Sequence, residues 1–300
     1  MPIQTAQNDY ISTQHCNHVA KIVWVTDIHL NFLDDSGIGD FIRKLQREKA
    51  DALFITGDIA EAPTVCSYLK RLEQSLDTEI YFVLGNHDFY NGFMDKVLDG
   101  VVNLSGNSSS LNFLDISPPV KIGNTGLVGH GGWADGRFGD FFGSQVWLND
   151  YELIGDFRRL TKDEIFDKLN GFGDAAALVL REKLENAFLE CDNVLCLTHV
   201  PPFRESCWHR GEISNDDYLP HFSCKVMGEM MMEVMESRPE SNLTVLCGHT
   251  HSPGRAQIRD NLLVIAGGAE YGRPEIQDVF YCTNAEKAQP RGAEMNRHRQ

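Results

Sequence analysis

Short apolar runs alternate with segments of helical spacing over the first hundred residues of the chain. The runs 21–26, 52–56 and 80–84 are rich in β-branched and aromatic residues, which is typical of buried strands. Apolar positions at helical spacing lie between them, over about 38–45 and 62–76. Because right-handed crossovers return each strand in the same direction, this βαβαβ order predicts a parallel sheet whose strands end at one edge.

The rest of the chain continues the alternation and predicts an α/β fold. Helices are predicted at about 91–102, 161–169, 174–190 and 223–237. Strands are predicted at 111–116, 125–129, 194–198 and 243–247, and a hairpin-like pair at about 256–265 and 277–282 closes the sheet. The shorter strands 111–116 and 125–129 indicate a mixed or second sheet.

Two loops and two chain ends complete the predicted organisation. Residues 129–150 form a glycine- and aromatic-rich loop, and residues 201–222 form a long polar loop. We expect a single domain over 21–283, a flexible leader over 1–20 and a disordered tail over 284–300.

Composition narrows the class of protein. The 300 residues, 42% of them hydrophobic, can bury a large core, and no run of about eighteen apolar residues could cross a membrane. The polar N-terminus lacks the features of a signal peptide and the eight cysteines are scattered, so we expect a cytoplasmic protein without a membrane partner. A net charge of −16 disfavours an extended nucleic-acid surface but is compatible with a small phosphorylated ligand held by metal ions. The oligomeric state stays open.

Metal-binding side chains directly follow five of the predicted strands. These strand ends carry carboxylates, imidazoles and one amide: Asp27, His29, Asp58, Asn86, His87, Asp88, His199, His249 and His251. A single histidine after a strand is usually structural, but five such ends in one chain are hard to attribute to chance. Oxygen and imidazole ligands without thiolate suit Mn²⁺, Fe, Zn²⁺ or Co²⁺. In Asp-x-His and His-x-His both side chains lie on one face of an extended segment, so one turn can supply one or two ions.

The turn Leu84-Gly85-Asn86-His87-Asp88 combines three kinds of polar group. Its amide, imidazole and carboxylate can serve as a metal ligand, a proton donor and the group that orients the donor. The alternative is a plain polar turn in which Asn86 and Asp88 favour a left-handed backbone and cap the next helix.

Together these blocks resemble the calcineurin-like metallophosphoesterase superfamily. The pattern of that superfamily is Asp-x-His, Gly-Asp, Gly-Asn-His-Asp/Glu, a lone His and Gly-His-x-His. The chain contains each block in order, as Asp27-Ile28-His29, Gly57-Asp58, Gly85-Asn86-His87-Asp88, His199 and Gly248-His249-Thr250-His251. The resemblance covers roughly residues 21–282 and implies a four-layer αββα sandwich, with two mixed sheets flanked by helices and a dinuclear metal site across the sheet edges.

The resemblance also implies two sets of ligands that share Asp58. The first ion would be held by Asp27, His29, Asp58 and His251. The second ion would be held by Asp58, Asn86, His199 and His249. The cofactors would be two divalent or trivalent transition-metal ions (Mn, Fe or Zn), and a bridging carboxylate suits two cations about 3.5–4 Å apart.

The implied reaction is hydrolysis of a phosphate ester. A hydroxide bridging the two ions would attack phosphorus in line, and both ions would neutralise charge on the phosphoryl oxygens. His87 would be the general acid that protonates the leaving alkoxide, and Asp88 would fix the His87 ring. The alternative is a catalytically inactive scaffold or binding protein with the same fold, although a scaffold has no need of every ligand.

Differences between the motifs of this chain and those of individual branches of the superfamily indicate which class of substrate to expect. Ser/Thr protein phosphatases carry Gly-Asp-x-Val-Asp-Arg-Gly and an Arg before Gly-Asn-His-Glu, whereas this chain has Glu61 after Gly57-Asp58-Ile59-Ala60, and Leu84 before Gly85. Purple acid phosphatases have Tyr where Glu61 stands. The motifs look closer to the branch with cyclic-nucleotide phosphodiesterases, so a small phosphomonoester or phosphodiester, including a cyclic nucleotide, is the expected substrate.

Two hypotheses concern the long loops. On the glycine-rich loop, His130, Trp133 and Arg137 are candidate substrate-selecting residues, against the alternative of an ordinary surface loop. Near the polar loop, four side chains could form a separate Zn²⁺ site, whereas the favoured interpretation is a lid beside His199 with reduced cysteines. The four side chains are Cys207, His209, His221 and Cys224.

Overall fold

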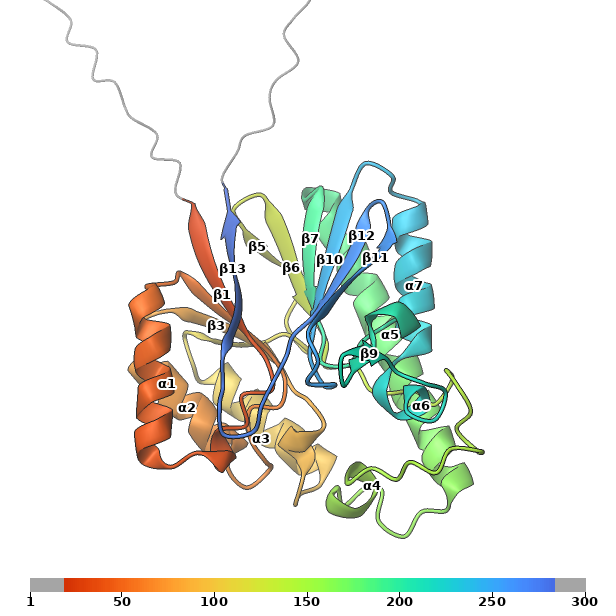
Figure 1. Ribbon diagram of the computed structural model, residues 1–300. Helices are drawn as coiled ribbons and strands as arrows, with labels where there is room; N and C mark the ends of the chain where they lie inside the picture. Colours follow the sequence, from red (N-terminus) through yellow and green to blue (C-terminus); the bar gives the residue numbers. More distant parts are fainter. Residues whose placement is uncertain (1–18, 284–300) are drawn as a thin grey trace, which may run out of the picture.

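Two β-sheets packed face to face form the centre of the computed structural model, which describes residues 19–283 (Figure 1). The first sheet has the order β13-β1-β2-β3-β4, with β13 (Ile276–Cys282), β1 (Ala20–Val25), β2 (Ala52–Thr56), β3 (Glu79–Val83) and β4 (Leu111–Phe113). Strands β1 to β4 are parallel, and β13 pairs with β1 antiparallel. The predicted βαβαβ sheet is therefore confirmed.

The second sheet has the order β11-β12-β10-β7-β6-β5. Its strands are β11 (Gly254–Arg259), β12 (Leu262–Ala266), β10 (Asn242–Cys247), β7 (Asn193–Leu197), β6 (Thr125–Gly129) and β5 (Val120–Ile122). Strands β12, β10, β7 and β6 are parallel, whereas β11 and β5 pair antiparallel at the two edges. The expectation of a second, mixed sheet is confirmed.

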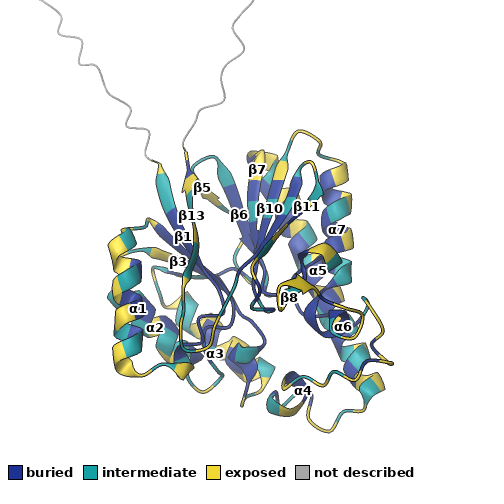
Figure 2. Cartoon of the chain, in the orientation of Figure 1, coloured by how far each residue is buried: buried dark blue, intermediate teal, exposed yellow. Residues whose placement is uncertain are grey.

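Side chains from both sheets form the core layer between them. Trp24 and Phe54 of the first sheet meet Leu127 and Leu246 of the second, and all four are nearly inaccessible to solvent. The indole of Trp24 donates a hydrogen bond to the hydroxyl of Thr56 (2.9 Å), so its one polar group is satisfied inside the core. In Figure 2 the inner strands are largely buried, whereas the edge strands β5, β11 and β13 are mostly intermediate or exposed.

Helices cover the outer face of each sheet. The first sheet is covered by α1 (Asp35–Glu48), α2 (Val65–Ser75) and α3 (Met94–Gly106), and the second by α5 (Lys162–Glu190) and α7 (Lys225–Glu236) (Figure 1). Methionines of α7 pack against the second sheet, as their helical spacing indicates. The four-layer αββα sandwich is confirmed.

One long helix replaces the two predicted over 161–169 and 174–190. Helix α5 runs without interruption through Gly171 and Gly173, although glycine costs about 1 kcal/mol relative to alanine inside a helix. A capping box between Thr161 and Glu164 stabilises its start, and its buried face packs against the second sheet and α7. Tertiary packing therefore overrides the weak local preference.

The C-terminal hairpin also differs from the prediction. Segment 256–265 is itself a hairpin, because β11 and β12 pair with each other. Strand β13, predicted as the second arm, crosses to the other sheet and pairs with β1. Hydrophobic alternation identifies a strand but does not identify its partner.

Short elements and chain ends complete the description. The long loops carry α4 (Asp150–Leu153), η3 (Arg204–Ser206), β8 (Trp208–His209), β9 (Glu212–Ile213) and α6 (Leu219–Phe222), and the turns after β1 and β3 carry η1 (Leu30–Phe32) and η2 (His87–Phe89). Within residues 19–283, no helix combines the length and apolar character needed to cross a membrane. The predicted tail 284–300 and residues 1–18 of the predicted leader lie outside the described residues.

Candidate metal centre

The carboxyl ends of five strands bring the predicted polar side chains to one edge of the sandwich. Asp27 and His29 follow β1, Asp58 follows β2, and Asn86 and His87 follow β3. From the second sheet, His199 follows β7, and His249 and His251 follow β10. Because the two sheets face each other, turns more than two hundred residues apart in sequence become neighbours.

The backbone at this edge is locally unfavourable. Asp27, His29, Asp58, His249 and His251 have φ angles of 48°, 40°, 52°, 72° and 56°, in the left-handed region that non-glycine residues rarely adopt. Such conformations persist only where the surrounding structure fixes them, and they cluster at functional sites. Strands β1, β2 and β10 therefore end in sharp turns that redirect candidate ligands toward the others.

Three glycines make the close approach of these turns possible. A β-carbon at Gly85 would collide with the Asp58 carboxylate, and one at Gly248 would collide with the Asp27 carboxylate and the Thr26 hydroxyl. A β-carbon at Gly57, whose φ is 88°, would press against the His199 ring. The glycines of the Gly-Asp, Gly-Asn-His and Gly-His motifs thus create space for neighbouring ligands.

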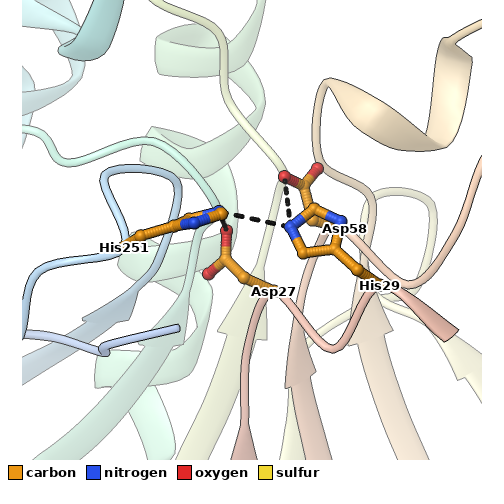
Figure 3. A group of neighbouring side chains, drawn as sticks. All are labelled: Asp27, His29, Asp58 and His251. Carbon is orange, nitrogen blue, oxygen red and sulfur yellow. Dashed lines mark hydrogen bonds and ion pairs between the residues drawn. The ribbon is translucent and has the colours of Figure 1, made fainter. Parts of the chain in front are cut away.

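Four donors form a tight first set. One donor atom from each of Asp27, His29, Asp58 and His251 lies within 4.8 Å of all the others (Figure 3). The Nε2 atoms of His29 and His251 are 3.2 Å apart, and His251 Nε2 lies 3.4 Å from Asp27 Oδ1. Asp58 Oδ2 is buried and has no hydrogen-bond partner among residues 19–283. A cation between these atoms would satisfy the Asp58 oxygen and the facing imidazole nitrogens together, so the residues fit a transition-metal ion.

A second set lies on the other side of Asp58. Asn86 Oδ1 is 3.0 Å from His199 Nε2 and 2.9 Å from His249 Nδ1, and His199 Nε2 is 3.4 Å from Asp58 Oδ1. The two oxygens of Asp58 therefore face different sets. Burial, and then the nearby Asp27 carboxylate, raise the pKa of Asp58 well above its ordinary value. Nearby cations would favour the charged carboxylate, so this set also fits a metal ion.

Backbone carbonyls orient the two histidines of the second set. The Nδ1 atom of His199 lies 2.9 Å from the Thr56 carbonyl, which leaves Nε2 facing Asn86. His249 has the opposite arrangement, because its Nε2 lies 3.3 Å from the His221 carbonyl and its Nδ1 faces Asn86. Hydrogen bonds of this kind fix which ring nitrogen is available to a metal.

His87 faces the same cluster, but Asp88 does not hold it. The His87 ring stacks on Tyr90 at 4.1 Å between centroids, and its buried Nδ1 atom has no hydrogen-bond partner in the described part of the chain. Asp88 instead accepts backbone N–H bonds from Ile59, Ala60 and Gly85, each at 2.9 Å. Asp88 therefore does not make the expected contact with the His87 ring. Its hydrogen bonds instead join the turn after β2 to the turn after β3.

Electrostatics keep the His87 imidazole neutral in the protein alone. Burial, followed by the adjacent His29 and His199 rings, lowers the pKa of His87 to about 2. Its Nε2 atom lies 4.0 Å from Asp58 Oδ2. An anion bound beside the ring would favour the protonated form that a proton donor needs.

The three residues predicted to select substrate have structural partners instead. Trp133 is buried and packs against three phenylalanine rings, Phe89, Phe157 and Phe172. Arg137 donates to Asn170 (2.9 Å) and pairs with Asp174 (2.8 Å). His130 Nδ1 accepts the N–H of Gly132 (2.9 Å). The loop folds back onto the core and α5, and the residues that line the cleft at the metal centre do not include these three, so their role in substrate selection stays a prediction.

The separate zinc site near the polar loop is not formed. Cys207 lies 3.4 Å from the Ser214 hydroxyl, His221 bonds Tyr151 (2.6 Å) and Ser144 (3.2 Å), and His209 packs against aromatic rings. Cys224 is buried as a free thiol. Within residues 19–283, these four side chains therefore do not form a group placed to share an ion, in contrast to Asp27, His29, Asp58 and His251.

A cleft of about 240 Å³ opens onto the metal centre. Several of its walls were not predicted from the sequence: Tyr90, Leu148, Asp150, Phe222 and Tyr271. These residues come from four separate segments and belong to no metal-binding motif. The local signal in the sequence was limited to polar residues such as Asp150, which stands among aromatic residues. The Tyr271 ring lies 4.7 Å from the His29 ring between centroids, tilted by 44°, and is half exposed.

Fold and donor sets together define a class of protein, the metallophosphoesterases. The sequence profile of the calcineurin-like phosphoesterases matches residues 20–253, and the chain belongs to this family. The comparison with curated proteins found no match.

Solved structures share the fold at low sequence identity. A phosphopantetheinyl hydrolase from Mycobacterium tuberculosis is 14% identical with a TM-score of 0.61, over 84% of this chain and 90% of that chain. A dimetal phosphatase from Danio rerio is 16% identical with a TM-score of 0.51, over 83% of this chain and 87% of that chain. A protein from Thermus thermophilus is 12% identical with a TM-score of 0.52, over 89% of this chain and 100% of that chain. At these identities the likeness concerns the fold alone.

Proposed function

We propose that this phosphoesterase hydrolyses a small phosphate ester at a pair of transition-metal ions, Mn, Fe or Zn. The observation that carries the proposal is the position of Asp58, whose two oxygens face two separate sets of donors. Asp27, His29 and His251 would hold the first ion with Asp58. Asn86, His199 and His249 would hold the second.

The chain's own residues would position the ester and supply a proton. Two bound ions contribute positive charge that polarises water and neutralises the phosphoryl group. His87 lines the cleft beside both donor sets, and stacking on Tyr90 holds its ring in place. We assign His87 the role of general acid, which passes its proton to the leaving oxygen once the phosphate anion has raised the pKa of the ring.

The cleft favours an ester with little negative charge and an apolar substituent. The described residues that line it include no lysine or arginine, so positive charge at the phosphate would come from the ions and from His87 once its ring is protonated. Tyr90, Phe222, Tyr271 and Leu148 offer ring and aliphatic surface to the rest of the molecule. This lining supports a monoanionic diester with an aromatic group over a dianionic monoester. Cyclic nucleotides belong to the favoured class, and the cytoplasmic setting stays a prediction.

Metal exchange with two aryl substrates tests the proposal. Chelation should abolish hydrolysis of an activated aryl phosphate, and Mn²⁺ should restore it. A bis-aryl phosphate should then be hydrolysed with a higher kcat/KM than the mono-aryl phosphate. Absence of hydrolysis of both esters in protein that holds two ions would support the alternative, a scaffold that binds without catalysis. A higher kcat/KM for the mono-aryl ester would reverse only the substrate assignment.

A further inference from the structure

Asp150 is a buried carboxylate beside the second donor set that the proposed reaction leaves without a role. It is 4% exposed and opens α4 at the end of the glycine-rich loop. Its Oδ1 atom accepts two hydrogen bonds, from Asn86 Nδ2 (2.8 Å) and from the Tyr90 hydroxyl (2.6 Å).

The contact with Asn86 determines which end of that amide faces the metal centre. The NH₂ group of Asn86 and the hydroxyl of Tyr90 both donate to the same Asp150 oxygen, so the NH₂ end of the amide points toward Asp150. The carbonyl oxygen then points toward His199 and His249, at 3.0 Å and 2.9 Å. Only that oxygen can bind a cation, because the amide nitrogen has no available lone pair. A half-turn of the amide would present NH₂ to the ion instead.

The contact with Tyr90 links the same carboxylate to His87. The hydroxyl of Tyr90 shares the acceptor oxygen of Asp150 with Asn86. The ring of the same Tyr90 stacks on the His87 imidazole, with an angle of 27° between the two planes. One carboxylate from a loop therefore holds both a candidate ligand and the ring beneath the candidate acid.

We infer that Asp150 is a positioning residue that locks the Asn86 amide with its oxygen toward the second metal ion. The inference rests on the proposed second ion, and it assigns no direct contact between Asp150 and that ion. Because the ligands of the first ion do not touch Asp150, the first ion should be insensitive to its replacement.

Calorimetric titration of the metal-stripped full chain with Mn²⁺ tests the inference without a substrate. D150A should weaken the second binding step by roughly 10–100-fold, the usual effect of removing a partner that orients a ligand. The first step should keep its affinity. D156A is the matched control, because Asp156 lies in the same region and accepts the Met94 N–H (2.8 Å) away from the centre. Both steps should keep wild-type affinity in D156A.

A second background separates orientation from general support of the fold. In N86D, the side chain at this position presents an oxygen whichever way it turns, and it faces a second carboxylate. D150A in the N86D background should therefore leave the second step unchanged or strengthen it. Equal weakening in both backgrounds would overturn the inference in favour of a structural role.

D150N keeps the shape of the side chain should D150A fail to fold. Its amide can donate as well as accept, so it no longer dictates the orientation of Asn86, and the second step should again weaken. Two wild-type binding steps in a folded D150A or D150N protein would overturn the inference alone. Fewer than two ions in the wild-type chain would instead overturn the proposed dinuclear centre, and the inference with it.

Discussion

The strand-end turns and the two long loops both border the metal centre, but they supply different things. The turns supply the candidate donor atoms, from Asp27 to His251. The loops 129–150 and 201–222 supply groups that hold those donors, such as the Asp150 carboxylate and the His221 carbonyl. The comparison indicates that short motifs encode the identity of a ligand, whereas its orientation depends on contacts with distant segments.

Removal of the shared carboxylate should have the largest effect at the strand ends. In D58A both donor sets lose an oxygen, so both Mn²⁺ ions and all measurable ester hydrolysis should be lost. Metal content measured after gel filtration, together with turnover of an aryl phosphate, checks the result. D260A removes an exposed carboxylate from the turn between β11 and β12 and should match wild type. Two ions retained in D58A would contradict the shared-ligand arrangement.

The candidate acid should respond differently from a ligand, although it comes from the same turn as Asn86. H87A should lower turnover by on the order of 10²–10⁴ while metal content stays at the wild-type level. The decrease should be greatest for esters with poor leaving groups, because these need the proton most. Steady-state rates across a series of substituted phenols measure this dependence. Wild-type turnover of an unactivated ester by H87A would remove the acid assignment.

Two glycine substitutions compare a position inside a metal-binding motif with a position outside the motifs. G85A should lower the free energy of unfolding by about 1–3 kcal/mol, the usual cost of overpacking, and should weaken metal binding because the Asp58 carboxylate is displaced. G171A is the control, because a β-carbon there meets nothing within 4 Å in α5 and should stabilise the helix by about 1 kcal/mol. Mn²⁺ titration and chemical denaturation measure the two effects. Unchanged metal binding in G85A would show that the turns tolerate more separation than the structure indicates.

The sequence was informative where chemistry and spacing are local. Each strand of the first sheet, and the groups that follow it, could be predicted because apolar runs and polar turns are continuous in the chain. Asp88 shows the limit of this reasoning. Its position beside His87 suggested an orienting contact, yet its oxygens bind the backbone of two turns. Adjacent residues in a tight turn need not point the same way.

Long-range pairing could not be predicted from the same patterns. Strand β13 has the alternation of a hairpin arm but pairs with β1, and Asp150 lies sixty-four positions from the amide that it holds. The prediction for His130, Trp133 and Arg137 meets a related limit. Composition placed them in a functional loop, whereas burial and pairing partners determine what each side chain contacts.

The smallest expected effect concerns Arg137. Its replacement tests whether this residue of loop 129–150 stabilises the fold or contacts the substrate. R137A removes a half-buried side chain that bonds Asn170 and Asp174 of α5, so unfolding free energy should fall by about 1 kcal/mol. KM should not change, because Arg137 lies outside the cleft. Y271A is the contrasting variant: it removes a half-exposed ring that lines the cleft, so KM for an aryl ester should rise while stability changes little. A raised KM in R137A with unchanged stability would restore the substrate role expected from the sequence.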